Sequence, residues 1–326
     1  MSQLHNVNVS DDKATAIIGG GATTKETIAA ADAAGVLLQT GGCNAVGILG
    51  SFLGGGYGLT MGMFGFGVDN ILEMRVVTAA GDLVTVSATQ NEDLFWAMLG
   101  AGQNFGIVTS ATVKAYAMPA EERVAWSGAL IFTEDKLEQV VSAMEKLHLS
   151  ERMVSFMYFA SGGPPTHTTM VITTVWMFQA SPEVGKEAFK SLYDIDPVMD
   201  TTRVLPYTEW NTGADPFCTH SQRKPAFAAG IDHLDVKVWR KVWDKLVDFQ
   251  KLPSANGSTV LLETFPMNKT RFAKEGSAAF PHRKTRFQAI VMPWYDDANL
   301  DEEAVKFGKE VRDLWCSSVV TGVHGP

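Results

Sequence analysis

The segment of residues 41–58, GGCNAVGILGSFLGGGYG, constrains the fold of this 326-residue chain more than any other stretch. Eight of its 18 residues are glycine, and apolar residues stand between them where a surface loop would carry polar ones. A segment of this kind is predicted to be buried and has little side-chain bulk. Its backbone N–H groups can approach a ligand closely, and a concave group of them suits a pyrophosphate. The alternative is a glycine-rich turn between buried elements.

A second glycine run, IIGGGATTKE at residues 17–26, is also a candidate phosphate site. It follows a predicted strand and opens a predicted helix, which is the setting of a Rossmann dinucleotide loop. The run lacks the third glycine that such a loop uses for close helix packing. We therefore interpret it as a tight strand-to-helix turn, with a nicotinamide site as the less favoured alternative.

Composition excludes several classes of protein. Hydrophobic residues make up 46% of the chain and charged residues 19%, so the chain can bury a large core. The net charge of −9 and the absence of a Lys/Arg-rich run argue against nucleic acid and anionic membranes as partners. No apolar stretch approaches the ~20 residues that span a bilayer. The polar first 13 residues do not read as a signal peptide, which predicts a cytoplasmic chain.

Cysteine and histidine usage predicts neither a disulfide framework nor a metal site. The three cysteines, Cys43, Cys218 and Cys316, are few and widely spaced. The seven histidines show no metal-ligand spacing.

Periodicity predicts an α+β protein of two domains, residues 1–119 and 120–326. In the first, Thr24 is expected to cap a helix that ends at Gly35, and Asn91 to cap a helix whose Phe95 and Trp96 face inward. Its strands are expected at 14–18, 73–79, 83–87 and 106–116. The second is expected to have a mostly antiparallel sheet flanked by helices. Its predicted strands are 123–133, 152–160, 167–178, 258–265 and 285–293, and its predicted helices are 135–148, 182–192, 234–250 and 299–314.

Several motifs in order resemble one family of flavoproteins. Segment 41–58 is similar to the flavin-binding loop of the oxidases related to berberine bridge enzyme, which share a PCMH-type (p-cresol methylhydroxylase-type) FAD-binding domain with vanillyl-alcohol oxidase. Residues 64–119, with FGFGVDN, VVTAAGDLV and NEDLFWAMLGAGQNFGIVT, follow the same family order. The segment SAAFPHRKTRFQAIVMPW at 277–294 resembles the FPHR segment of the substrate domain.

The resemblance implies FAD as cofactor and assigns residues to it. Cys43 stands where some members attach flavin through sulfur, and the alternative is a small buried cysteine. Asp69 and Asn70 are expected to fix the loop instead of touching the cofactor. A bulky residue at Gly55 is expected to abolish binding by filling the space for the pyrophosphate. The residues expected to contact FAD are Gly41, Gly42, Cys43, Val46, Gly47, Gly50, Gly54, Gly55, Tyr57, Asn104, Gly106, Ile107 and Val108.

Two segments of the family have no counterpart in this sequence. One is the N-terminal segment with the histidine that usually anchors flavin, and the other is the C-terminal region that supplies a tyrosine in several members. We therefore expect loosely held flavin, weak turnover by this chain alone, and self-association through uncovered flavin-domain surface. Full-length relatives are often secreted.

The resemblance implies an FAD-linked oxidase or oxidative cyclase of secondary metabolism. Hydride passes from a small, fairly apolar substrate to flavin, dioxygen reoxidises the flavin, and a protein base takes an O–H or N–H proton. The candidate bases are His282, Glu263, Tyr207 and Glu209. For His282 the alternative is a role in domain packing beside Arg283. The alternative function for the chain is a flavin-free or weakly binding scaffold, acting as a pericyclase-like cage or an assembly partner.

Overall fold

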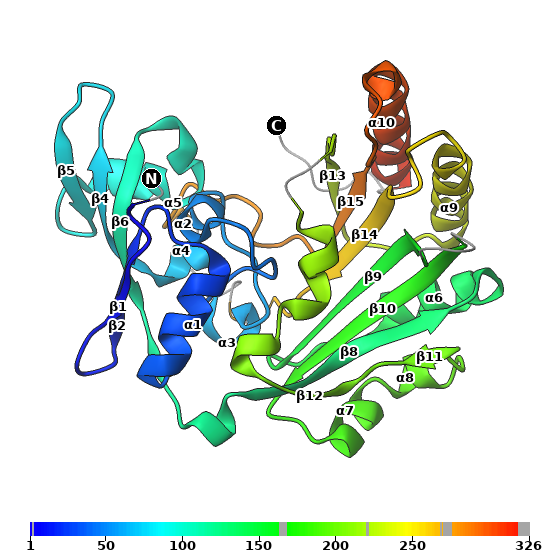
Figure 1. Ribbon diagram of the computed structural model, residues 1–326, viewed down its shortest axis with the longest axis horizontal. Coiled ribbons are helices and arrows are strands. Elements are labelled where there is room, and N and C mark those ends of the chain that lie inside the picture. The colour runs from blue at the N-terminus through cyan, green and yellow to red at the C-terminus, as the bar shows by residue number, and fades with distance from the viewer. Residues whose placement is uncertain (2, 163–167, 220–221, 268, 270–275, 319–326) are drawn as a thin grey trace.

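The computed structural model describes residues 1–318 except 2, 163–167, 220–221, 268 and 270–275. Two antiparallel sheets organise this part of the chain (Figure 1). The first lies within residues 7–114 and the second within residues 124–292. The predicted α+β class is confirmed. The division at residue 119 stays a prediction, because one hydrophobic core joins residues from both sides of it.

The first sheet has five strands in the order β1-β2-β6-β4-β5. Every neighbouring pair is antiparallel, which differs from the parallel sheet of a Rossmann domain. The predicted strands 73–79 and 83–87 correspond to β4 and β5, which pair antiparallel on either side of a short turn. The strands are β1 (Val7–Val9), β2 (Thr15–Gly19), β4 (Ile71–Val77), β5 (Leu83–Ser87) and β6 (Ile107–Lys114).

Helix α1 (Thr24–Ala34) begins and ends as its sequence indicates, with its cap one residue earlier than predicted. The Thr23 side chain accepts from the Glu26 backbone N–H, and the Glu26 carboxylate accepts from the Thr23 backbone N–H. The helix ends at Gly35, whose φ of 77° suits a glycine. Backbone atoms of Met1 and Leu4 crowd Gly19 and Gly21, so this run is a packed turn and not an open phosphate loop.

Helix α5 (Glu92–Ala101) differs from the prediction in two details. Asn91 makes no side-chain capping bond to the helix. Phe95 is buried as expected, but Trp96 is 46% exposed. The Trp96 side chain does not pack in the core, and its indole N–H donates to the Gly276 carbonyl oxygen at 2.7 Å.

Residues 41–58 are called the glycine segment from here on. Short elements that periodicity did not predict lie within and around it. Three helices of four or five residues begin at Ile48, Met61 and Gly67, and a two-stranded sheet precedes and follows them in the chain. Elements this short carry too few residues for a hydrophobic period to be visible. They are α2 (Ile48–Phe52), α3 (Met61–Phe64), α4 (Gly67–Asn70), β3 (Val36–Leu37) and β7 (Tyr116–Ala117).

The second sheet has the order β11-β8-β10-β9-β14-β15-β13, with β12 also paired to β8. All of the predicted strands are present within about two residues. The short strands β11 and β12 and the five-residue strand β13 were not predicted. The strands are β8 (Val124–Phe132), β9 (Met153–Ser161), β10 (Thr169–Phe178), β11 (Met199–Asp200), β12 (Arg203–Pro206), β13 (Phe227–Ile231), β14 (Thr259–Thr264) and β15 (Phe287–Met292).

Helices cover one face of this second sheet (Figure 1). Alternate strand residues such as Met157, Phe159 and Leu262 pack against Trp239 and Trp243 of the covering layer. The opposite face is turned toward the glycine segment and carries the candidate site. The helices are α6 (Leu137–Lys146), α7 (Pro182–Ala188), α8 (Lys190–Tyr193), α9 (Val236–Gln250) and α10 (Asp301–Ser318).

Among the described residues, none of the helices combines the length and apolar character needed to cross a membrane. In the same part of the chain, His, Cys, Asp and Glu form no cluster of three or more that could hold a metal ion.

Candidate flavin and substrate site

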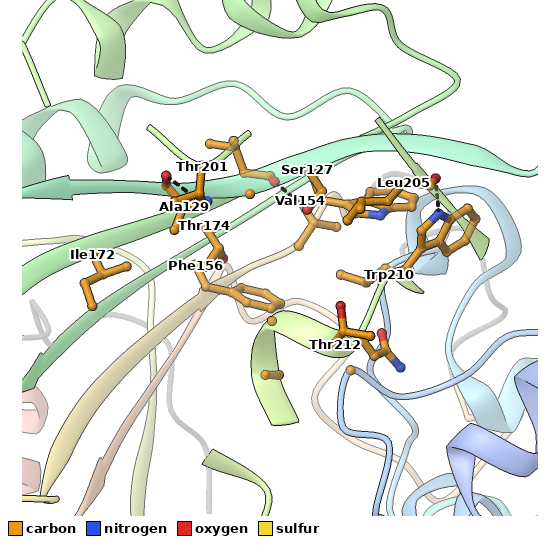
Figure 2. A pocket seen from close by; sticks show the side chains of 18 of the residues that line it. Ser127, Ala129, Val154, Phe156, Ile172, Thr174, Thr201, Leu205, Trp210 and Thr212 are labelled. Carbon is orange, nitrogen blue, oxygen red and sulfur yellow. Dashed lines mark hydrogen bonds between the residues drawn. The ribbon is translucent and has the colours of Figure 1, made fainter. Parts of the chain in front are cut away.

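A cavity of about 450 Å³ lies on the uncovered face of the second sheet (Figure 2). Its floor is made by side chains of β8, β9 and β10, among them Phe156, Tyr158 and Trp176. Its volume lies in the range of small-molecule sites, and aromatic and aliphatic groups dominate its surface. Gly42 of the glycine segment also lines it, so the cavity lies beside the predicted flavin loop.

Strand register extends this floor toward the partly buried carboxylate of Glu263. Phe156 on β9 is paired with Thr174 on one side and with Glu263 of β14 on the other. Glu263 is in turn paired with Gln288 of β15. Paired residues of antiparallel strands point to the same face. Glu263 and Gln288 therefore continue the row of cavity-facing residues, one and two strands beyond Phe156.

Glu263 is placed to accept a proton near neutral pH. Burial raises the pKa of its carboxyl group from 4.5 to about 7. The charge of Glu263 adds to burial in raising the pKa of the Tyr57 and Tyr158 hydroxyls, so both tyrosines stay protonated. Gln288 Nε2 donates to the Tyr57 hydroxyl oxygen at 3.0 Å. Tyr57 belongs to the glycine segment, which therefore meets the sheet beside Glu263.

The glycine segment has two parts with different surroundings. A Cβ atom added at Gly42, Gly47 or Gly50 would meet no atom within 4 Å, so this part borders open space. At Gly54, Gly56 and Gly58 an added Cβ would lie within 2.9 Å of protein atoms, so that part is packed into the fold. The first part is therefore the one whose backbone can face a ligand.

Gly55 is required by the packing of the fold. Its φ is +122°, and an added Cβ would lie 2.4 Å from the Phe280 ring. Only glycine fits at this position against the FPHR segment, and the contact of Gly55 with FAD stays a prediction.

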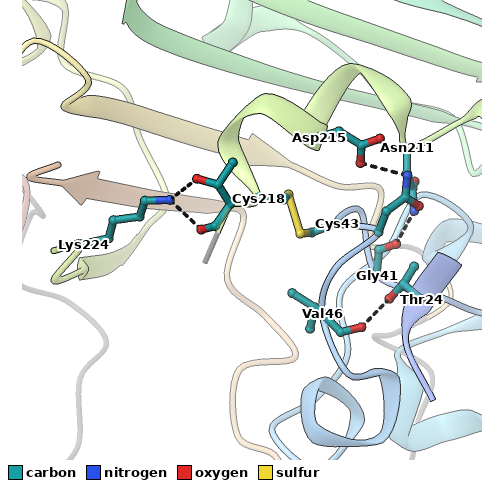
Figure 3. Close-up of a disulfide and its surroundings, with 10 residues drawn as sticks. Thr24, Gly41, Cys43, Val46, Asn211, Asp215, Cys218 and Lys224 are labelled. Atoms are coloured by element: carbon teal, nitrogen blue, oxygen red, sulfur yellow. Dashed lines mark hydrogen bonds between the residues drawn. A yellow bond between two sulfur atoms is a disulfide. The ribbon is translucent and has the colours of Figure 1, made fainter. Parts of the chain in front are cut away.

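The other predicted cofactor residues occupy varied positions. Val46 is exposed, while its carbonyl oxygen accepts from Thr24 N and Oγ1, as Figure 3 shows for the hydroxyl. Ile107 is 59% exposed, and Val108 has its side chain in the core. An added Cβ at Gly106 would lie 2.6 Å from Val76. The Asn104 amide nitrogen donates to the Ala101 carbonyl oxygen at 3.2 Å. Their contact with FAD stays a prediction.

Asp69 holds the segment that follows the flavin loop. Both of its carboxylate oxygens accept from Arg283, at 2.7 and 3.0 Å. One of them also accepts from the Phe66 backbone N–H at 3.0 Å. His282, beside Arg283, is exposed and stacks edge-on near Phe280 at 5.8 Å. This placement favours the packing role for the FPHR segment over a role for His282 as a base.

Tyr207 does not fit the role of a base. It is 2% exposed and lies in the shared core beside Trp210. Its hydroxyl accepts from the Leu38 backbone N–H and donates to the Leu38 carbonyl oxygen, both at 3.3 Å. Burial raises the pKa of this hydroxyl. Tyr207 follows β12 of the second sheet, and its bonds therefore hold that sheet to the segment that contains Leu38. The fourth candidate, Glu209, is exposed and paired with Arg203 at 3.3 Å.

Cys43 forms a disulfide, which corrects the expectation that the cysteines are unpaired. The structure joins it to Cys218 in a disulfide, with 6.1 Å between the two Cα atoms (Figure 3). The sequence analysis predicted no disulfide, because 175 residues separate the two cysteines and spacing alone carries no information on such a pair. While the sulfur of Cys43 is bonded to Cys218 it cannot also be bonded to flavin.

Comparisons with known proteins find similar sequences and similar folds. Residues 1–87 match the family model described as an FAD binding domain. Over the whole chain the fold matches BBE-like 28 of Arabidopsis thaliana, with a TM-score of 0.81 at 18% identity, covering 100% of this chain and 69% of that one. It also matches xylooligosaccharide oxidase of Myceliophthora thermophila, with a TM-score of 0.80 at 20% identity, covering 98% and 70%. The fold is thus that of the PCMH-type flavoprotein oxidases related to berberine bridge enzyme.

The chain is similar to fungal FAD-linked oxidoreductases, and its residues 1–87 match an FAD binding domain. It is 29% identical to the FAD-linked oxidoreductase hasG of Aspergillus fumigatus over 330 residues, covering 97% of this chain and 69% of that protein. Across eight curated relatives that it matches, the chain spans 60% to 69% of their length. The resemblance found in the sequence is confirmed, and with it FAD as the cofactor of the family.

The described residues fit FAD along the open part of the glycine segment. Gly42, Gly47 and Gly50 leave open space along a backbone that lies beside the cavity. Bulky side chains there would close off the approach of a large planar cofactor. Gly42 and the residues that follow it would therefore hold the cofactor between the glycine segment and the sheet.

Sequence reasoning missed Gln288, Tyr158 and the hydrophobic cavity floor. Alternation along β9 and β15 marks which residues share a face, but it does not say which face is covered by helices. The signal for Gln288 was a polar residue among apolar ones in a predicted strand.

Proposed function

We propose that this chain oxidises a small, largely apolar, ring-containing metabolite of the kind found in secondary metabolism, with FAD as cofactor and Glu263 as the base. The observation that carries the proposal is the position of Glu263. It continues the row of side chains on the cavity floor, and it influences Tyr57 of the glycine segment. A carboxylate at that junction can take a proton from a substrate that lies between the sheet and the glycine segment.

The cavity supports an apolar substrate. Phe156 and Trp176 offer ring faces, and Val154, Ile172 and Leu205 add aliphatic surface. Aromatic side chains bind flat rings by stacking and by edge-to-face contact. Hydroxyl groups at the cavity wall can orient substrate oxygens, and they belong to Ser127, Thr174, Thr201 and Thr212.

Glu263 supplies proton transfer at neutral pH. A base works best when its pKa lies near the working pH, and the raised pKa of about 7 meets that condition. Glu263 would take the proton of a substrate hydroxyl, while Gln288 and the Tyr57 hydroxyl hold the polar end of the site in place. When bound, FAD supplies the hydride acceptor, and dioxygen is the proposed final acceptor.

Anaerobic reduction of FAD-loaded protein tests the proposal. We expect phenols or benzylic alcohols to bleach the oxidised-flavin absorbance, and xylobiose, a sugar rich in hydroxyl groups, to leave it unchanged. Glu263→Gln should slow bleaching by roughly 10²–10⁴-fold, the usual contribution of a general base. Glu187→Gln is the matched control, because Glu187 is exposed on α7 and does not line the cavity, so its loss should change the rate little. Equal rates in the two variants would remove Glu263 from the mechanism.

A further inference from the structure

One wall of the cavity is fastened to the glycine segment at three points. This wall segment comprises residues 211–218 and includes the 3₁₀ helix η5 (Thr212–Phe217). Asn211 Nδ2 donates to the Gly41 carbonyl oxygen at 2.9 Å, and Asn44 Nδ2 donates to Asp215 Oδ1 at 2.9 Å. The third connection is the Cys43–Cys218 disulfide (Figure 3).

The disulfide lies next to residues that line the cavity. Cys43 follows Gly42, and Cys218 follows Phe217, and both of those neighbours face the cavity. The Phe217 ring stacks on Tyr158 of the floor, with ring centres 5.5 Å apart and planes 20° from parallel. A covalent bond at Cys218 therefore limits how far Phe217 can move away from Tyr158.

Both cysteines can react with small thiols and disulfides. Each side chain is only partly buried. The wall segment is short, and the two hydrogen bonds that join it to the glycine segment contribute only about 1 kcal/mol each. Removal of the covalent bond should therefore loosen the wall without unfolding either sheet.

We propose that Cys43 and Cys218 form a thiol–disulfide site that controls access to the cavity. In the disulfide form the wall segment is tied to the glycine segment, and in the dithiol form it opens. The same exchange decides whether the Cys43 sulfur is available to flavin. The role assigned to the cavity rests on the proposed function, whereas the opening of the wall does not.

The chemistry is exchange with a low-molecular-weight disulfide such as oxidised glutathione. One cysteine thiolate attacks that disulfide, forms a mixed disulfide and releases one glutathione thiolate. The second cysteine thiolate then attacks the protein sulfur of the mixed disulfide and releases the other glutathione thiolate. The two cysteines lose two protons and two electrons, and the glutathione disulfide gains them. Two molecules of reduced glutathione reverse the exchange.

Peptide mapping without reductant tests the bond itself. After equilibration with oxidised glutathione and alkylation of free thiols, we expect one peptide pair linked through Cys43 and Cys218, and Cys316 either alkylated or joined to one glutathione. Excess reduced glutathione should convert both cysteines to alkylated thiols. Alkylation of Cys43 and Cys218 under both conditions would overturn the proposal.

Hydrogen exchange tests the opening, and it needs neither substrate nor FAD. On reduction, backbone amides in residues 212–218 should exchange at least about tenfold faster, while those of β9 and β10 keep their rates. Cys218→Ser should show the fast rate with or without reductant. Cys316→Ser, which removes an exposed cysteine on α10, should behave as the unmodified chain. Unchanged exchange in 212–218 on reduction would overturn the proposed opening, even if the chain proves to be an active oxidase.

Discussion

The Gln288 amide donates to the Tyr57 hydroxyl over 3.0 Å, and this bond joins β15 to the glycine segment. Gln288 is also the strand partner of Glu263. The bond therefore fixes the distance between the predicted flavin loop and the proposed base, two elements that lie more than 200 residues apart in the chain.

Tyr57→Phe tests this connection. The ring keeps its contacts with Phe66, Phe265 and Phe280, so the loss of stability should be close to that of one hydrogen bond, about 1 kcal/mol. Turnover of FAD-loaded protein should fall more than this small change in stability would cause, because Gln288 and Glu263 lose their orientation. Thermal unfolding and kcat measured on the same sample separate the two effects. An unchanged kcat would show that the bond serves packing alone.

The raised pKa of Glu263 predicts a specific dependence of stability on pH. The folded state holds this proton up to about pH 7, and the unfolded state loses it near pH 4.5. The contribution of Glu263 to the free energy of unfolding should therefore fall as pH rises from 4.5 to 7 and stay flat above it. Glu263→Gln should remove this fall and stabilise the fold at pH 8 by roughly 1–3 kcal/mol. Urea unfolding of both chains from pH 5 to pH 8 measures it, and parallel curves would contradict the assignment.

The same carboxyl group predicts how the rate depends on pH. A base must be unprotonated to act, so the rate of flavin reduction should rise with pH, with an apparent pKa near 7. Rapid-mixing measurements from pH 5.5 to 8.5 give this profile. A rate that falls over this range would require an acid in place of the base.

The Arg283–Asp69 pair predicts a large effect on stability. Both side chains are mostly buried, and the two bonds form a fork that lysine cannot reproduce. Arg283→Ala should cost about 3 kcal/mol and Arg283→Lys somewhat less, because each leaves Asp69 poorly paired. Arg312→Ala, at an exposed pair with Asp313, is the control and should cost under about 1 kcal/mol. Urea unfolding compares the three variants, and equal losses at both sites would contradict the proposed role of Asp69.

Two glycines separate packing from cofactor binding. Gly55→Ala should destabilise the fold by more than about 2 kcal/mol, since the new methyl group meets Phe280 at a positive φ. Gly50→Ala places its methyl group in open space, so thermal unfolding should show little change, while FAD titration should show weaker binding. Gly50→Ala with unchanged FAD affinity would mean that the cofactor lies elsewhere.

Sequence reasoning predicted the long elements because their patterns are long. The 3.6-residue period of α9 and the apolar strands β9 and β10 appear within about two residues of their predicted ends. The elements of the glycine segment, such as α2, are shorter than the period that would reveal them. The helix cap is Thr23 and not Thr24. A capping box needs a glutamate three residues after the cap, and Glu26 stands at that distance from Thr23 only.

The site was harder to predict than the fold. Glu263 was selected as a candidate together with Tyr207 and His282, and the sequence did not distinguish buried packing from access to a ligand. Tyr207 is engaged by the Leu38 backbone, which lies 169 residues away. The Cys43–Cys218 pair depends on the approach of two loops that no local pattern encodes.

Titration of the purified chain with FAD tests the central claim most directly. The claim is that the glycine segment, at Gly42 to Gly50, holds FAD beside the cavity. We expect quenching of FAD fluorescence that saturates at one FAD per chain and weakens in Gly50→Ala, whose thermal unfolding matches that of the original chain. A folded chain that leaves FAD fluorescence unchanged at saturating concentration would contradict the account and favour a flavin-free scaffold.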